Sequence, residues 1–154
     1  MTDVRISVLL EEIMDSLKPQ AASSQVFMHV DCQPLCIKAN VQQIKELLTN
    51  LLSNAVKYNH PGGQVWINIR EQDDNMVIRV RDNGMGIPEE SLDRIFERFY
   101  RVDKGRSRKQ GGTGLGLSIV SDTVRRQGGT VEAANRPGGG AVFTVRWSAE
   151  EGEA

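Results

Sequence analysis

The feature that most constrains this chain is a glycine-rich loop that leads directly into a predicted helix. Four glycines fall within the six residues from Gly111 to Gly116, and residues 118–126 have helical spacing. Glycines leave the backbone with bare N–H groups and little steric restraint. At a helix N-terminus such groups attract anions, and the helix dipole adds to the attraction. From this stretch alone, a phosphate-binding loop and a flexible surface loop both remain open.

Two well-known nucleotide-binding motifs do not fit this loop. A P-loop requires Lys and then Ser or Thr directly after its last glycine, whereas Leu117 follows Gly116 here. A dinucleotide-binding loop directly follows a strand, whereas residues 104–110 are charged and have no strand pattern. A nucleotide at this loop would therefore be held in a different way.

Length and charge narrow the classes of protein that this chain can belong to. Its 154 residues suit one domain of roughly 100–200 residues. The net charge of −1 gives no overall attraction to nucleic acid or to an acidic membrane. No apolar run approaches the ~18 residues of a membrane span, and no signal-peptide pattern follows Met1. We therefore expect a cytoplasmic chain, or a cytoplasmic piece of a larger one, with a membrane-bound sensor as one option for the larger protein.

The two cysteines, Cys32 and Cys36, lie close together in the sequence. Two thiols cannot complete a four-ligand zinc site, and the nearby His29 and Asp31 add little. We therefore favour two unpaired thiols in a reducing compartment.

The clearest predicted helix covers residues 40–59. Its broad apolar face is formed by Val41, Ile44, Leu47, Leu48, Leu51, Leu52 and Ala55. At ~100° per residue, a polar stripe opposite that face is formed by Glu46, Asn50, Asn54 and Lys57. This stripe fits the solvated side of an amphipathic helix, but Asn is a weaker helix former than Glu, Lys or Gln. Because an Asn oxygen suits Mg²⁺ and Lys suits phosphate, we favour a ligand-binding stripe.

Periodic patterns place the other elements. Apolar spacing predicts a helix from about Ser7 to near Pro19. Alternation predicts a hairpin from strands 64–70 and 76–81, and further strands at 26–31, 35–37, 130–134 and 141–147. A short helix is expected from Pro88, and a longer one over residues 115–127. The acidic tail, residues 148–154, has no apolar anchor beyond Ala, and we expect it to be disordered.

Two further segments carry chemistry. The second hairpin strand runs into Asp82, followed by Gly84 and Gly86. A carboxylate at a strand end can accept a hydrogen bond from an amine edge such as that of adenine, although a tight turn also fits this sequence. Residues 98–109 contain six Lys or Arg, which fits either a disordered basic loop or a lid near phosphates.

Four segments, taken in order, resemble the motifs of the ATP-binding catalytic domain of sensor histidine kinases. That family is grouped with DNA gyrase, the Hsp90 chaperones and the mismatch-repair protein MutL. Residues 46–58 resemble its N box, 82–88 its first glycine box, 95–101 its F box and 111–117 its second glycine box. The resemblance covers about residues 5–147.

The resemblance implies a fold and a ligand. The fold is α+β, a two-layer α/β sandwich with helices on one face of a mixed, largely antiparallel sheet (the Bergerat-type ATP-binding fold). Residues 1–147 would form the catalytic domain, with ATP and Mg²⁺ as cofactors. The nucleotide-binding positions carried over are Asn50, Asn54, Lys57, Tyr58, Asp82, Gly84, Gly86, Ile87, Arg101, Lys104, Arg108, Gly112, Thr113, Gly114, Leu115, Gly116, Leu117 and Thr144.

On the phosphate side, the resemblance implies that Asn50 holds Mg²⁺ through its side-chain oxygen. Asn54 and Lys57 would contact phosphates, and residues 112–117 would wrap them with the basic lid nearby. Glu46 and Lys57 are the implied catalytic residues, because Glu46 has the position that activates water in the ATPase relatives.

On the base side, the resemblance implies that Asp82 binds the exocyclic amine of adenine and that Gly86 allows close approach. Tyr58 would line the nucleotide. Thr144, on the last strand, would support Asp82 through water.

The implied function is transfer of the γ-phosphoryl group of ATP to a histidine on a separate helical hairpin, in two-component signalling. An acidic residue follows the phosphoacceptor His of the family, whereas Val30 follows His29 and Pro61 follows His60. We therefore expect a piece of a larger kinase, whose partners are that hairpin and a response regulator. We expect no nucleic-acid partner, and a monomer in isolation. Two alternatives are a self-contained ATPase with Glu46 as general base, and a nucleotide-sensing or protein-binding module.

Overall fold

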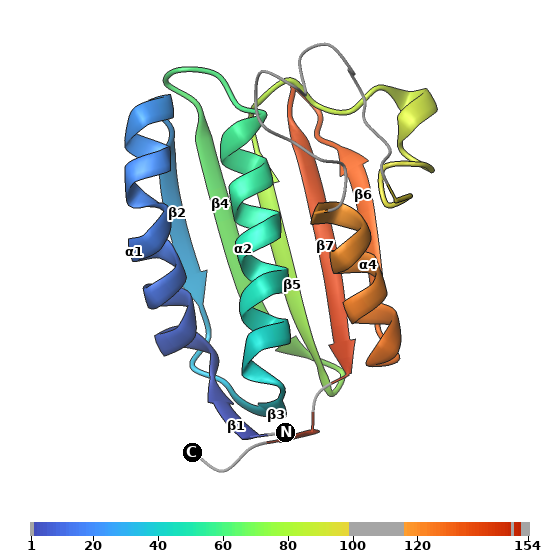
Figure 1. Ribbon diagram of the computed structural model, residues 1–154. Coiled ribbons are helices and arrows are strands. Elements are labelled where there is room, and N and C mark those ends of the chain that lie inside the picture. The colour runs from blue at the N-terminus through green and yellow to red at the C-terminus, as the bar shows by residue number, and fades with distance from the viewer. Residues whose placement is uncertain (1, 99–115, 149, 152–154) are drawn as a thin grey trace.

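Residues 2–98, 116–148 and 150–151 are described by the computed structural model, and they form two layers. One layer is a sheet with the order β2 (Phe27–Cys32), β4 (Gln64–Gln72), β5 (Asn75–Asp82), β7 (Ala141–Ser148) and β6 (Thr130–Asn135). β2 runs parallel to β4, and the other neighbours are antiparallel. The second layer holds α1 (Ile6–Ser24), α2 (Val41–Lys57) and α4 (Gly116–Arg126), all on one face (Figure 1). The predicted α+β sandwich is confirmed.

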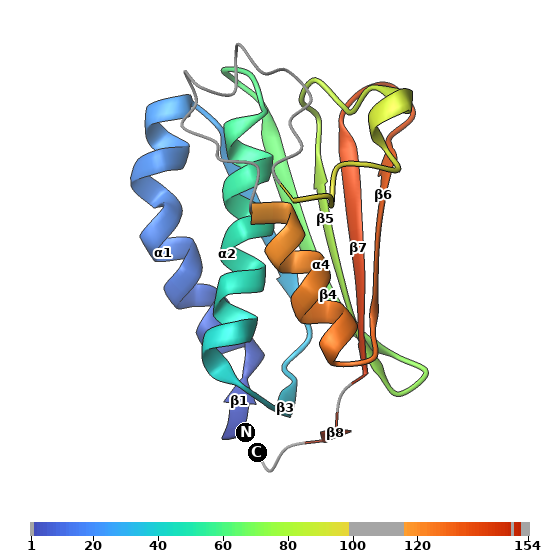
Figure 2. The ribbon, with the colours of Figure 1, turned by 45° about the vertical axis from the view of Figure 1, so that its right-hand side comes forward.

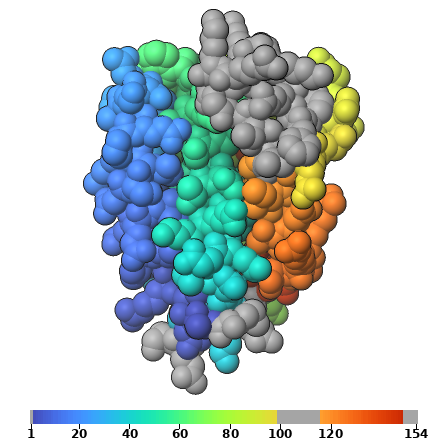
Figure 3. Space-filling model, in the orientation of Figure 1, coloured from blue at the N-terminus to red at the C-terminus, as the bar shows by residue number. Residues whose placement is uncertain are grey.

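Strand alternation assigns every side chain of the sheet to one of two faces. On β4, Val65, Ile67 and Ile69 are buried under the helices, whereas Trp66, Asn68 and Arg70 point the other way. We call these two sides the helix face and the open face. Side chains of α1, α2 and α4 form a continuous layer over the helix face (Figure 3). The apolar face of α2 lies at the centre of the core, with Ile44, Leu47, Leu48, Leu51 and Leu52 at most 1% exposed.

The first helix runs beyond the expected stop at Pro19 and ends at Ser24. Proline lacks the N–H of one helical hydrogen bond, which usually ends or kinks a helix. Here Ala21 packs into the core beyond the proline, at 6% exposure. Gln25 then closes the helix in the left-handed region, with φ of 57°, and its N–H donates to the carbonyls of Ala21 and Ala22. The expectation was wrong because core packing outweighs the lost hydrogen bond.

A smaller sheet joins the two ends of the described chain (Figure 2), in the order β1 (Thr2–Arg5), β3 (Cys36–Ala39) and β8 (Glu150–Glu151). We expected residues 148–154 to be disordered, and three of them are not. Ser148 ends β7, and Glu150 and Glu151 pair with β3. Strand pairing uses backbone groups and needs no apolar anchor, so the side chains gave no signal. Residues 149 and 152–154 lie outside the described residues.

The short helix expected from Pro88 is a single 3-10 turn, η1 (Glu89–Ser91), with Pro88 just before it. Within the ranges that the structure describes, no helix has the length and hydropathy to cross a membrane.

Candidate functional site

Asp82 is the centre of the candidate site. It ends β5 on the helix face, pairs with buried Val65, and is only 7% exposed. Its Oδ1 accepts hydrogen bonds from the N–H groups of Gly84 at 2.9 Å and Ala141 at 3.2 Å. Among the described residues, no hydrogen bond reaches Oδ2. One carboxylate oxygen is therefore fixed by the backbone, and the other can accept a hydrogen bond from a ligand.

The ionisation of Asp82 is set by opposing effects. Burial raises the pKa of this carboxyl above its ordinary value, while the Gly84 and Ala141 N–H groups and the Arg136 guanidinium act against that rise. Arg136 also donates from Nη1 to the Asp82 carbonyl oxygen at 2.9 Å. A buried acid with a perturbed pKa and an open acceptor oxygen is a candidate binding group.

Glycine at position 140 allows the start of β7 to approach Asp82. Gly140 has φ of +91°, and a Cβ there would lie 1.9 Å from the Asp82 carbonyl oxygen. No other residue fits this position without moving the two strands apart. The Ala141 N–H that holds Oδ1 therefore depends on the preceding glycine.

The loop that follows Asp82 is held from two sides. Asn135, at the end of β6, forms two hydrogen bonds with the Ile87 backbone: its Oδ1 accepts from the N–H at 2.7 Å, and its Nδ2 donates to the carbonyl at 2.6 Å. Gly86 has φ of +74°, and a Cβ there would lie 3.0 Å from the same Asn135 Oδ1. On the other side, the Met85 N–H donates to the Tyr58 carbonyl at the end of α2, at 3.5 Å.

We expect Asn135→Ala to loosen this loop without unfolding the protein. It removes two exposed hydrogen bonds, each worth about 1 kcal/mol, and should speed amide exchange of residues 83–88 by about tenfold or more. Hydrogen–deuterium exchange measures the change. Glu132→Ala, an exposed position on the same strand, is the matched control. Equal exchange in the two variants would show that Asn135 does not hold the loop.

The start of the loop is tied to the segment between α2 and β4. Asn83 Oδ1 accepts from the Gln64 N–H at 2.7 Å, and the Asn83 carbonyl oxygen lies 3.0 Å from His60 Nε2. Asn59 Nδ2 donates to the Gln64 carbonyl oxygen at 3.0 Å. These side chains fix the backbone on which Asp82 sits.

The polar stripe of α2 begins at an exposed residue and becomes half-buried. Glu46 is exposed, while Asn50, Asn54 and Lys57 are half-buried. Asn50 Nδ2 is fully buried and has no hydrogen-bond partner in the described part of the chain. The side chain faces the start of α4, since a Cβ on Gly116 would lie 3.7 Å from Asn50 Oδ1. A buried amide without a partner costs about 1–3 kcal/mol, which indicates a place for a ligand.

The structure brings part of the predicted site together. Tyr58 ends α2 beside the Asp82 loop, where a Cβ on Gly84 would lie 2.6 Å from the Tyr58 carbonyl oxygen. Gly116 and Leu117 begin α4, next to Asn50. Seven positions predicted to bind nucleotide fall outside the described residues, namely Arg101, Lys104, Arg108, Gly112, Thr113, Gly114 and Leu115.

The expectation for Thr144 is wrong. On β7, Phe143 and Val145 are buried on the helix face, so Thr144 between them points to the open face. It pairs with Arg79 and lies on the opposite side of the sheet from the Asp82 side chain. The residue that supports Asp82 is Ala141, through its N–H. The alternation of residues 141–147 already carried this signal, because Thr144 is out of phase with the apolar residues.

No three His, Cys, Asp or Glu side chains gather as a metal site within residues 2–98, 116–148 and 150–151. Mg²⁺ in nucleotide sites commonly takes one or two protein ligands and completes its shell with phosphate oxygens and water. The lone amide of Asn50 fits such a sparse protein contribution.

Comparison with known proteins agrees with this geometry. Residues 39–151 match the family described as histidine kinase-, DNA gyrase B-, and HSP90-like ATPase. Sensor histidine kinase YkoH of Bacillus subtilis (strain 168) is 39% identical over 127 residues, which are 82% of this chain and 28% of YkoH. The solved catalytic domain of histidine kinase ThkA has a TM-score of 0.83 at 26% identity, covering 95% of this chain and 93% of that one. Full-length ShkA in complex with AMPPNP has a TM-score of 0.85 at 28% identity, covering 99% of this chain and 32% of ShkA.

The chain spans only part of the curated relatives that it matches. It covers 28% of YkoH, 18% of the sensor histidine kinase WalK and 36% of the sensor-like histidine kinase SenX3. These relatives therefore contain long segments to which nothing in this chain corresponds.

Proposed function

We propose that this chain binds Mg-ATP and donates the γ-phosphoryl group to a histidine on a separate helical hairpin. The chain belongs to the family of histidine kinase-, DNA gyrase B- and HSP90-like ATPases. In this transfer the bond between the γ-phosphorus and the bridging oxygen breaks and ADP leaves. A bond forms between phosphorus and an imidazole nitrogen. The protein then contributes mainly positioning and charge stabilisation.

The observation that carries this proposal is that only one of the two carboxylate oxygens of Asp82 is hydrogen-bonded within the described residues. Two backbone N–H groups hold Oδ1, and Oδ2 has no donor among the described residues. An exocyclic amine of adenine is a donor of the required kind. Tyr58 and Ile87, which flank the loop after Asp82, would line the base.

On the phosphate side, the proposal places Asn50 on Mg²⁺ and Asn54 and Lys57 on phosphate oxygens. The unpartnered Nδ2 of Asn50 is a donor and supports an acceptor such as a phosphate oxygen, while its Oδ1 is the proposed Mg²⁺ ligand. When bound, Mg²⁺ offsets the negative charge of the phosphates. We also propose that residues 112–117 wrap the phosphates and that Arg101, Lys104 and Arg108 lie near them.

Glu46 and Lys57 are the proposed catalytic residues. Glu46 lies one helical turn before Asn50 on α2, so its carboxylate is placed on the same stripe as the groups proposed to hold Mg²⁺ and phosphate. Lys57 supplies a positive charge at the other end of that stripe. We further propose a cytoplasmic location and a response regulator as the downstream partner, on the strength of the sensor kinases that the chain resembles.

The test is phosphotransfer in trans. The chain is mixed with the phosphoacceptor hairpin of its parent kinase and with γ-labelled ATP. Label on the hairpin, stable to base and lost in acid, is the expected result. Steady release of phosphate without the hairpin, abolished by Glu46→Ala, would instead establish a self-contained ATPase. Absence of nucleotide binding by calorimetry would overturn both and leave a protein-binding module.

A further inference from the structure

The open face of the sheet has a composition unlike that of an ordinary solvated surface. In the described part of the chain, no helix covers it (Figures 1 and 2). Five arginines gather on it or at its margin: Arg70, Arg79, Arg81, Arg136 and Arg146. None of the five strands contains a lysine, and the whole chain has six lysines and thirteen arginines.

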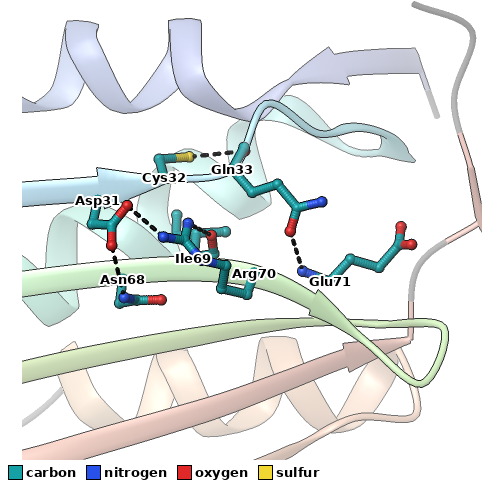
Figure 4. A network of polar contacts seen from close by, with 7 residues as sticks. All are labelled: Asp31, Cys32, Gln33, Asn68, Ile69, Arg70 and Glu71. Carbon is teal, nitrogen blue, oxygen red and sulfur yellow. Dashed lines mark hydrogen bonds and ion pairs between the residues drawn. The ribbon is translucent and has the colours of Figure 1, made fainter.

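Most of this positive charge is not neutralised. Arg70 forms an ion pair with Asp31 at 2.5 Å, and Asn68 donates to the same carboxylate at 3.3 Å (Figure 4). Glu132 is the other acid on the face, beside Thr144. Among the described residues, Arg79, Arg81, Arg136 and Arg146 have no ion-pair partner. Arg136 acts on the Asp82 carboxyl, which leaves Arg79, Arg81 and Arg146 uncompensated on one flat surface, where they create a local positive potential in a chain of net charge −1.

Two of the arginines contact an aromatic side chain near one end of the face. Arg136 and Arg81 lie over the Trp66 ring, with guanidinium-to-centroid distances of 4.9 Å and 5.6 Å. His29 stacks on the same ring, with centroids 5.9 Å apart. Phe27, on the neighbouring strand β2, is 61% exposed. Cation–π contacts hold the two arginines in place, so less side-chain entropy is lost when a partner binds.

We propose that the open face, with Trp66, Arg81 and Arg136 at one end and Arg79 and Arg146 further along β5 and β7, docks an acidic segment of a partner protein. Arginine and tryptophan are the residues most enriched at protein–protein hot spots, and lysine is depleted there. Arginine also binds carboxylates through two parallel hydrogen bonds. A nucleic-acid partner fits less well, because nucleic-acid-binding domains are usually basic overall, whereas this chain has a net charge of −1.

The size of the face sets the kind of complex. β4, β5 and β7 hold eight or nine residues each, which at ~3.4 Å per residue gives a length of ~30 Å. Five strands at ~4.8 Å spacing give a width of ~20 Å, and thus an area of ~600 Å². A standard interface buries ~800 Å² per partner, so this face fits a short segment bound weakly and reversibly.

Trp66, Arg79, Arg81 and Arg146 lie on the opposite side of the sheet from the Asp82 side chain, so a partner bound there leaves that site accessible, and only Arg136 contacts both. The inference therefore goes beyond the proposed function and does not depend on it. Its test uses a readout that requires no nucleotide.

The probe is a short synthetic peptide in which glutamates flank one Phe, labelled with fluorescein for anisotropy. The full 154-residue chain should bind it, and more weakly as salt is raised, because exposed charge attraction is screened. The double variant Arg79→Gln/Arg146→Gln should weaken binding about tenfold. The matched control, Arg125→Gln/Arg126→Gln, removes the same charge from exposed positions at the end of α4 and should leave binding unchanged.

Tryptophan emission locates the bound peptide. Trp147 is 1% exposed on the helix face, so a change in emission on adding unlabelled peptide should come from Trp66 and vanish in Trp66→Phe. Equal loss of affinity in both double variants would overturn the proposal, as would tighter binding of an oligo(dT) strand than of the peptide. Sedimentation showing that the chain alone dimerises through this face, with loss in Arg79→Gln/Arg146→Gln, would also overturn it. Thermal melting confirms that each variant is folded.

Discussion

Asp82→Asn is expected to weaken ATP binding by about 100-fold or more while leaving the protein folded. The Asn oxygen can still accept from the Gly84 and Ala141 N–H groups, which contact only Oδ1. The Asn Nδ2 then takes the place of Oδ2 and presents a donor to the adenine amine, itself a donor. Unpaired donors in a site built for a hydrogen bond cost several kcal/mol of binding. Calorimetric titration with a non-hydrolysable ATP analogue measures the loss.

The same substitution has a predictable effect on stability. Burial raises the pKa of Asp82 above its ordinary value of 3.8, so the folded state binds this proton more tightly than the unfolded state does. Stability therefore falls as pH rises from the unfolded pKa through the folded pKa, and the deficit persists at neutral pH. Asn carries no charge and removes that deficit. At pH 7, Asp82→Asn should melt at the same temperature as the wild type or higher.

A conservative change at an exposed carboxylate gives the control. Asp15→Asn lies on α1, where the Asp15 side chain is 71% exposed, and should change neither affinity nor melting temperature. If Asp82→Asn binds the ATP analogue as tightly as the wild type does, Asp82 does not bind adenine. A lower melting temperature with lost affinity would show that the carboxylate serves the fold, because the two effects would then share one cause.

Sequence reasoning found the groups whose signals are local. Asp82 stood out as an acid at the end of an alternating strand, followed at once by two glycines. The stripe of α2 followed from helical spacing and from the presence of Asn where better helix formers are available. Such patterns depend on neighbours a few residues away, which is the range over which periodicity carries information.

Contacts between distant segments could not be found in this way. Asn135 holds Ile87 across 48 residues, and Arg136 reaches the Asp82 carbonyl across 54. The Asn135 side chain binds the N–H and the carbonyl of Ile87, and such backbone groups have no sequence signature. Arg136 itself lies between two predicted strands, where no local pattern points to Asp82. Which strands pair is decided by core packing, and it is this pairing that brings Ala141 to Asp82.

Where local signals conflicted with packing, packing prevailed. Pro19 is a helix stop by local rules, yet the burial of Ala21 carries α1 beyond it. Thr144 is polar and lies on β7, the strand that pairs with the strand ending at Asp82, yet the two-residue period places it on the open face. The two corrections have the same origin. Packing against the core decides where α1 ends and which face of the sheet Thr144 occupies.

Asn50→Leu is expected to stabilise the free protein and to remove most of the effect of Mg²⁺ on nucleotide affinity. Asn50 Nδ2 is buried without a partner among the described residues, and replacing it with an apolar group removes a penalty of about 1 kcal/mol or more. Leu is also a better helix former than Asn, which acts in the same direction. For a chain of this size each kcal/mol corresponds to ~2–4 °C, so thermal melting should show a rise of several degrees.

The gain in stability and the loss of metal response should occur together only at this position. In the wild type, nucleotide affinity measured by calorimetry should rise with Mg²⁺, and in Asn50→Leu most of that rise should disappear, by about tenfold or more. Asn54→Leu, one helical turn further along α2, is the matched control with the same gain in helix propensity. It should weaken nucleotide binding with and without Mg²⁺ alike, and it should melt below Asn50→Leu. If Asn50→Leu melts below the wild type, or keeps the full response to Mg²⁺, then the buried amide serves the fold and the metal is held elsewhere.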